Sequence, residues 1–150
     1  MTPNNLPSER TAIVGVIDPD VTAAGDVSTG WVAAKDFHNF MAIVFAGTLG
    51  SSATLDAKIE QATDSSGTGA KDVTGKAITQ MTQAGTDSDK QAIINVKQSD
   101  LDIANSFTHL RLTVTVATAS SDAGAVLLGF DPAYGAASDY DATTVDEIVA

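Results

Sequence analysis

The segment His38–Leu49, which reads HNFMAIVFAGTL, is the longest apolar run in the chain and constrains the fold more than any other stretch. Residues 41–46 follow one another without a polar side chain. A short apolar run with β-branched and aromatic residues is typical of a strand that is buried on both faces. A helix is the alternative, but the run is short, and Gly47 and Gly50 would end it at once. We therefore predict that this segment is the central strand of a β-sandwich.

Other segments alternate between apolar and polar residues, as half-exposed strands do. Phe107–Ala117 shows the clearest pattern and should place Leu110, Leu112, Val114 and Val116 in the core. Thr54–Thr63 also alternates, although its composition would suit a helix as well. Further strands are expected at Thr11–Ile17, Trp31–Lys35, Ala77–Met81, Gln91–Lys97 and Ala125–Phe130. About eight short strands with little helix predict an all-β fold, an antiparallel β-sandwich or a jelly-roll-like barrel with extended termini.

The length of 150 residues fits one domain. We expect an N-terminal arm at residues 1–10, a β-sandwich domain at residues 11–135, and an acidic C-terminal tail at residues 136–150. The arm contains two prolines and the tail is small and acidic, so neither can bury much apolar area. Within these ranges, Val21–Gly30 is expected to be a loop, and Val145–Val149 a single helical turn.

Composition limits the partners of the chain. The formal net charge is -11 and the sequence pI is about 4.2, so phosphate backbones would repel it and direct nucleic-acid binding is not expected. No segment approaches the roughly 20 apolar residues of a membrane span, and no signal peptide is visible. Cysteine is absent, which excludes disulfides and thiolate chemistry. Charged residues make up 18%, so the surface must be covered largely by small uncharged side chains, which suits contact with other proteins.

Candidate catalytic and metal-binding residues are few. His38 and His109 are the only histidines, and each is interpreted as structural. The acidic pairs Asp18 and Asp20, Asp87 and Asp89, and Asp139 and Asp141 do not continue into a calcium-binding loop. The loop Ser65–Gly69 lacks the ending of a phosphate-binding loop, and no serine sits in a nucleophile elbow. We therefore expect no enzyme activity, no catalytic, cofactor-binding or metal-binding residues, and no cofactor.

Several segments together resemble a family of small structural proteins found beside capsid genes in tailed phages, prophages and gene-transfer-like elements. They are FMAIVFAGTL (residues 40–49), LDAKIEQATD (55–64), SGTGAKDVTGKAITQ (66–80), QAIINVKQSDLD (91–102), FTHLRLTVTVA (107–117) and VLLGFDPAYGAASD (126–139). The resemblance covers about residues 11–146, and its motifs are structural rather than catalytic.

The resemblance implies a virion protein, assembled in the host cytoplasm, and favours a head decoration (cement) protein. Its implied partners are the major capsid protein or other virion proteins and further copies of itself, with a trimer favoured. Two alternatives remain. One is a neck or tail component, such as an adaptor, stopper or tail-completion protein. The other is a receptor- or glycan-binding β-sandwich, for which Trp31, Tyr134 and Tyr140 are the available aromatic residues.

Overall fold

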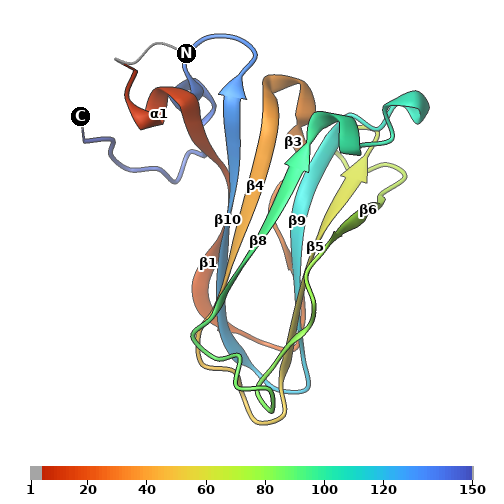
Figure 1. Ribbon diagram of the computed structural model, residues 1–150, viewed down its shortest axis with the longest axis vertical. Helices are drawn as coiled ribbons and strands as arrows, with labels where there is room; N and C mark the ends of the chain where they lie inside the picture. Colours follow the sequence, from red (N-terminus) through yellow and green to blue (C-terminus); the bar gives the residue numbers. More distant parts are fainter. Residues whose placement is uncertain (1–4, 150) are drawn as a thin grey trace.

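The computed structural model describes residues 5–149, which fold into two antiparallel β-sheets packed face to face (Figure 1). The strands are β1 (Thr11–Thr22), β2 (Gly25–Ser28), β3 (Val32–Ala33), β4 (Phe37–Ala46), β5 (Thr54–Ala62), β6 (Lys71–Ala77), β7 (Met81–Thr82), β8 (Gln91–Lys97), β9 (His109–Ala117) and β10 (Ser121–Pro132). The helical turns are α1 (Pro7–Arg10) and the 3₁₀ helices η1 (Ala34–Asp36), η2 (Gln98–Asp100), η3 (Ile103–Asn105) and η4 (Ala137–Tyr140). The prediction of an all-β antiparallel sandwich is confirmed.

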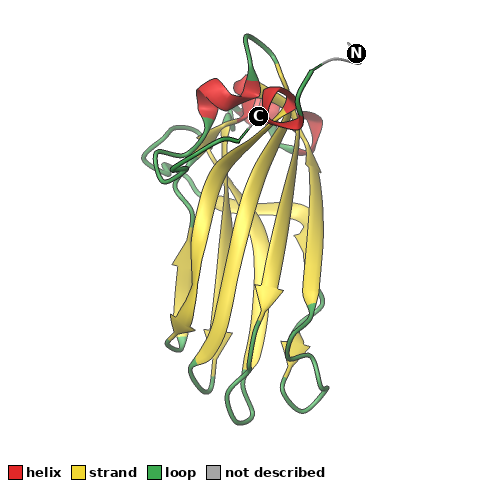
Figure 2. Ribbon diagram, turned by 90° about the vertical axis from the view of Figure 1, so that its left-hand side faces the viewer, coloured by secondary structure: helices red, strands yellow, loops and turns green. Residues whose placement is uncertain are grey.

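The two sheets differ in strand order. Sheet A has the order β1-β10-β4-β8, so β10, the last strand in the sequence, lies between β1 and β4. Sheet B has the order β2-β9-β5-β6, with β3 also pairing with β9 and β7 with β5. Long loops join the sheets at the end of the sandwich opposite the helical turns (Figure 2).

The core lies between the sheets and is built by alternation along the central strands. On β9, Leu110, Leu112, Val114 and Val116 are at most 1% exposed, as the alternation predicted. On β4, Phe40, Ala42 and Val44 face them from sheet A and are equally buried. Phe37 packs edge-on against Phe40, with ring centroids 5.8 Å apart. The prediction of a strand at Thr54–Thr63, rather than a helix, is also confirmed by β5.

The burial of β4 differs from the prediction. Only one of its faces is in the core: its burial alternates along Phe37–Ala46, and within residues 5–149 the helices gather at one end of sheet A rather than over it (Figure 2). Met41 and Ile43 are half-buried on the outer face, and Phe45 is 43% exposed there. The strand is thus internal in its sheet, as predicted, but its apolar residues are not all covered by this chain.

Some element boundaries also differ from the sequence interpretation. Gly25–Ser28, predicted to be part of a loop, forms β2 because its backbone pairs with β9. The strand predicted at Ala77–Met81 is wrong, since β6 ends at Ala77 and β7 begins at Met81, each paired separately with β5. Trp31–Lys35 yields only the two residues of β3 before η1 begins. In the C-terminal segment, the helical turn is at Ala137–Tyr140 rather than at Val145–Val149.

The described parts of both terminal segments lie against the same end of sheet A (Figure 1). Arg10 at the end of α1 is 3.6 Å from the carboxylate of Asp131. The backbone N–H of Ile13 donates to Asp141 Oδ1 at 2.7 Å, and the N–H of Ala142 donates to the Ile13 carbonyl at 2.7 Å. These bonds occupy part of the free edge of β1, which would otherwise be open to another strand.

Candidate interaction surface

The outer face of sheet A carries apolar side chains on all four strands, although β8 contributes only Ile93 and its other outward residues, Gln91, Asn95 and Lys97, are polar. The strand register aligns Val16, Val126, Ile43 and Ile93 in one row from β1 to β8. A neighbouring row contains Ile13, Leu128 and Met41. Phe45 lies at one end beside Gly124, and Phe130 at the other. We call these nine apolar side chains, Ile13, Val16, Met41, Ile43, Phe45, Ile93, Val126, Leu128 and Phe130, the apolar face.

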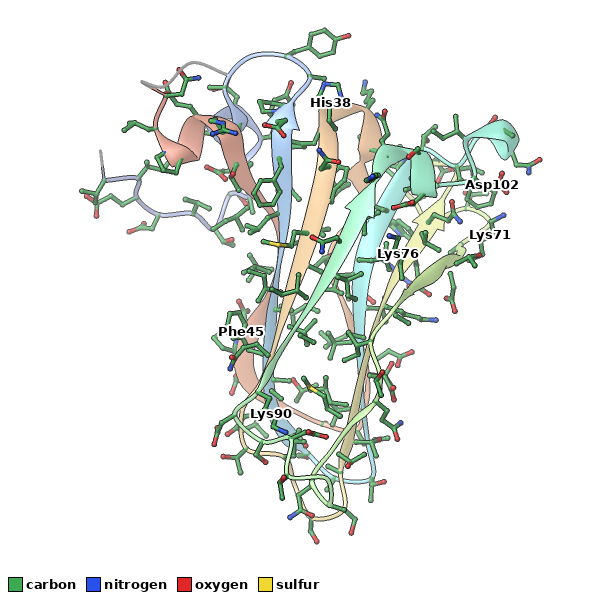
Figure 3. All side chains as sticks on the ribbon, in the orientation of Figure 1. His38, Phe45, Lys71, Lys76, Lys90 and Asp102 are labelled. Carbon is green, nitrogen blue, oxygen red and sulfur yellow. The ribbon has the colours of Figure 1, made fainter. Side chains whose placement is uncertain are left out.

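The apolar face is accessible in the isolated chain. Ile93 is 59% exposed and Phe45 is 43% exposed, and the other members are half-buried. Phe45 points away from sheet B in Figure 3. In Figure 2, where this side of the molecule faces the viewer, the helices and the C-terminal segment gather at one end of the sheet. No member of the apolar face carries a charge, so contact with another apolar surface would desolvate no ion.

Shallow hollows flank Phe45. One of about 140 Å³ is lined by Ile17, Pro19, Phe45 and Gly124 together with its neighbours on β10, and a second of about 240 Å³ adjoins it toward Asp122. At this place β1 lies close to β10, since a Cβ on Gly124 would be only 2.8 Å from Pro19 Cα. The face is therefore nearly flat along its middle and indented beside its largest exposed ring.

The outer face of sheet B has the opposite character. Glu60 Oε2 accepts hydrogen bonds from Arg111 Nε at 2.8 Å and Thr113 Oγ1 at 2.6 Å, and Lys58 Nζ is 3.4 Å from the other oxygen. Burial acts to raise the pKa of Glu60, but the bonds from Thr113 and Arg111 outweigh it, so the pKa is lowered from its ordinary value. The guanidinium of Arg111 also stacks on Trp31, 4.5 Å from the ring centroid. The charged side chains around Glu60 thus find their partners within the same chain.

Ion pairs fix the loop after β8 to sheet B (Figure 3). Lys71 Nζ is 2.6 Å from Asp102 Oδ2, and Lys76 Nζ is 3.0 Å from Asp100 Oδ2. The hydrogen bond from Lys71, followed by that from Asn105, lowers the pKa of Asp102. These contacts hold η2 and the segment before η3 against β6.

The structure does not bring the two histidines together. His38 is exposed on β4 of sheet A, at the end of the sandwich near the helical turns (Figure 3). His109 begins β9 of sheet B, and its Nδ1 is 2.9 Å from Thr108 Oγ1. The two histidines thus lie in different sheets.

The acidic pairs are equally dispersed. Asp87 accepts a hydrogen bond from the Thr82 N–H at 2.9 Å and one from Lys90 Nζ at 2.9 Å, while Asp141 accepts from the Ile13 N–H. Asp18 and Asp20 are exposed on β1. Within residues 5–149, no group of three or more His, Asp or Glu side chains could hold a metal ion.

The three aromatic residues considered for glycan binding do not form one platform. Trp31 packs on Arg111 beside sheet B, whereas Tyr140 packs edge-on against Phe37 with ring centroids 5.3 Å apart. Tyr134 is 75% exposed in the loop after β10. The apolar face was missed by the sequence interpretation, although the unbroken apolar runs of β4 and β10 signal it.

No protein-family model matches the chain, and no curated protein matches it. Among solved structures, the chain is similar to a protein of the T13 particle of infectious bursal disease virus, with 11% identity and a TM-score of 0.50 over 87% of this chain and 34% of the viral one. A structure of the Gx strain of the same virus has 13% identity and a TM-score of 0.44, again over 87% and 34%. Empty particles of cowpea mosaic virus have 11% identity and a TM-score of 0.43, over 85% and 86%. The chain thus spans about a third of the length of the first viral protein.

In the part of the chain that the structure describes, no helix is long and apolar enough to cross a membrane. At these identities the likeness is one of fold: the chain has the β-sandwich architecture also seen in the T13 virus particle.

Proposed function

We propose that the protein is a non-enzymatic structural component of a virion, and that it acts as a head decoration (cement) protein of a tailed-phage-like particle. The observation that carries this proposal is the apolar face. A group of nine apolar side chains that crosses a four-stranded sheet in one row is costly to leave in water, so it suits a protein whose working state is an assembly.

The fold and the resemblance in sequence support the same role. The β-sandwich occurs in the T13 virus particle, and the segments quoted above resemble structural proteins encoded beside capsid genes. A decoration protein works mechanically. Each bound copy buries surface on shell subunits, so opening the shell must also break those contacts. The partners are then the major capsid protein or other virion proteins, and the resemblance adds a homo-oligomer, with a trimer favoured.

The proposal keeps the division into an N-terminal arm at residues 1–10, a sandwich domain at 11–135 and an acidic tail at 136–150. The arm is the better candidate for contact with the shell, because Pro3 and Pro7 reduce the conformational freedom that binding removes. A deletion of residues 1–10 should leave the sandwich folded and lower the occupancy of particles.

The deciding experiment adds purified protein to particles that lack it and measures the bound copy number against the shell subunit by quantitative mass spectrometry. A decoration protein should reach a copy number comparable with that of the shell subunit and should raise the temperature at which particles open. A copy number far below this, at one vertex, would instead identify a neck or tail component. Absence from particles, together with binding to a glycan array, would support the receptor-binding alternative.

Matched variants connect this experiment to the apolar face. Phe45→Ser removes its largest exposed ring and should lower occupancy, because that ring contributes buried area. Tyr134→Ser removes an exposed ring outside the face and should leave occupancy unchanged. If both variants and the unmodified protein occupied particles equally, the apolar face would not be the surface that binds the shell.

A further inference from the structure

The two edge strands of sheet A, β1 and β8, differ in how their outward backbone groups are bonded (Figure 1). On β1, the N–H and the carbonyl of Ile13 are bonded to the C-terminal segment, and the N–H of Val21 donates to Asp20 Oδ1 at 2.6 Å. Pro19 has no N–H, and the register of β1 with β10 breaks twice. Features of this kind keep an edge strand from pairing with another strand, so β1 is a protected edge.

The edge of β8 is open along its middle. The Ala46 N–H donates to the Lys90 carbonyl at 2.9 Å, and β4 and β8 then pair without a break in register. Because hydrogen bonds between antiparallel strands alternate, every second residue of β8 bonds to β4. The residues between them direct their N–H and carbonyl groups away from β4, and they are Gln91, Ile93 and Asn95. No strand lies beyond β8 in sheet A, and within residues 5–149 the N–H groups of these three residues have no hydrogen-bond acceptor.

This open run is closed at both ends, equally far from Ile93 in the sequence. On one side, the N–H of Asp89 donates to the Gly47 carbonyl at 3.1 Å. On the other side, the N–H of Lys97 donates to Asp100 Oδ2 at 2.7 Å. The backbone groups left for another strand are therefore symmetric about Ile93.

We propose that this edge pairs with β8 of a second copy of the chain, antiparallel, with Ile93 of each copy opposite Ile93 of the other. In this register Gln91 lies opposite Asn95 of the other copy, so polar side chains meet on the outer face. The same register places Ala92 opposite Ile94 on the inner face. The strand is thus complementary to itself when read in the antiparallel direction, and this symmetry favours a second copy over an unrelated strand.

The net charge of -11 acts against pairing, but the charges beside β8 favour it. Asp87 is 2.9 Å from Lys90, and Asp100 is 3.0 Å from Lys76, so these carboxylates are paired within the chain. Asp89 and Asp122 line one hollow before β8, and the register brings Lys97 of the other copy to this acidic end. Acidic side chains elsewhere contribute little repulsion at physiological ionic strength, because charges more than about 8 Å apart are then largely screened.

The pairing joins the two apolar faces without covering them. Two sheets A become one continuous sheet, and the row Val16, Val126, Ile43 and Ile93 continues into the same row of the other copy in reverse order. The use of this joined face rests on the proposed function, because it offers the shell the apolar face twice over. The contact is isologous and joins two copies, so we expect a dimer in place of the trimer that the resemblance implies.

Cysteine substitutions test the contact, because the chain has no cysteine of its own. Ile93→Cys places two thiols opposite each other with Cα atoms about 5.5 Å apart, within the range for a disulfide, and should give a covalent dimer on mild oxidation. Ile103→Cys is the control, because Ile103 is 55% exposed, close to the 59% of Ile93, but lies in η3, and it should stay monomeric over the same time. Equal cross-linking of these two variants overturns the proposed contact.

A mixture of two variants tests the register. Gln91→Cys and Asn95→Cys chains should form mainly the mixed dimer, because position 91 lies opposite position 95 of the other copy and not opposite itself. A mixed dimer no more abundant than random pairing predicts overturns the proposed register.

Sedimentation equilibrium of the full chain from about 1 to 500 µM, in about 0.15 M salt, measures the pairing without a cross-link. The unmodified protein should pass from 15.3 kDa towards twice this mass. Asn95→Pro removes an N–H that points away from β4 and should weaken pairing at least about tenfold. Asn95→Ala removes the same side chain but keeps the N–H, and should change pairing by less than about threefold.

Circular dichroism at low concentration verifies that both variants fold. If Asn95→Pro does not, Lys97→Asp takes its place and should weaken pairing, because it brings a carboxylate to Asp89 of the other copy. A monomer at every concentration, or a mass of three copies, overturns the inference.

The proposed function is tested separately on particles. If the protein is monomeric, and Asn95→Pro lowers particle occupancy while Asn95→Ala does not, the edge of β8 pairs with a strand of the shell. That result overturns the second copy and leaves the function in place. Pairs in solution from a protein that binds no particles would keep this contact and refute the proposed function.

Discussion

Two apolar residues on central strands should respond very differently to truncation. Leu112 on β9 is fully buried between the sheets, whereas Ile43 on β4 lies half-buried on the apolar face. Leu112→Ala removes three carbon atoms, worth about 2.4 kcal/mol at roughly 0.8 kcal/mol per methylene. The cavity left between two packed sheets adds to this, so the total should be about 3–4 kcal/mol, within the usual range of roughly 2–5 kcal/mol.

Ile43→Ala should cost only about 1 kcal/mol, because its side chain is half-buried on the outer face of sheet A, next to its register partners Val126 and Ile93, and its removal leaves no enclosed cavity. Urea unfolding of both variants measures the two free energies of unfolding. The midpoint should fall with an unchanged denaturant dependence. Equal costs for both variants would refute the reasoning, since sheet A would then be covered on its outer face within one chain.

Three further results are expected. Because the folded-state pKa of Glu60 is lowered by Thr113 and Arg111, its contribution to stability is complete above the unfolded pKa of about 4.3 and is lost as the pH falls through the folded value. Unfolding free energies measured from pH 7 to pH 3 should therefore decline more steeply for the unmodified protein than for Glu60→Gln. Gly129→Ala should destabilise the fold by about 1–3 kcal/mol in thermal or urea unfolding, because the new Cβ would be 2.6 Å from the buried ring of Phe37; an unchanged midpoint would mean that the ring can move aside. Calcium or a chelator should leave the melting temperature unchanged, and a strong rise with calcium would contradict the dispersed placement of the acidic side chains.

The fold class could be predicted because alternation is a local property of the sequence. The residues of β9 alternate strictly, and their inward leucines and valines are those that the structure buries. Pairing partners could not be predicted in the same way. Gly25–Ser28 has the composition of a loop and forms β2 only because its backbone pairs with β9. The break between β6 and β7 arises because the two short segments pair with different parts of β5.

The apolar face shows why the candidate site could be predicted only in part. The run at residues 41–46 correctly indicated a strand, but the prediction that both of its faces are buried is wrong within this chain, because an apolar run does not say what lies against each face. The terminal segments show a related limit. Ala142 and Asp141 contact Ile13 through backbone and carboxylate hydrogen bonds, so their packing leaves no apolar pattern to detect.

The place of β10 between β1 and β4 also determines when the chain can fold. During synthesis, β1 and β4 emerge early, but the strand that joins them is residues 121–132 of 150. Until then β1 has no partner in sheet A, and its apolar residues stay exposed on the nascent chain. Closure of the sheet brings together residues far apart in sequence, such as Thr11 and Phe130, so we expect slow folding in which sheet A cannot close before β10 has emerged, with a requirement for protection from aggregation until then.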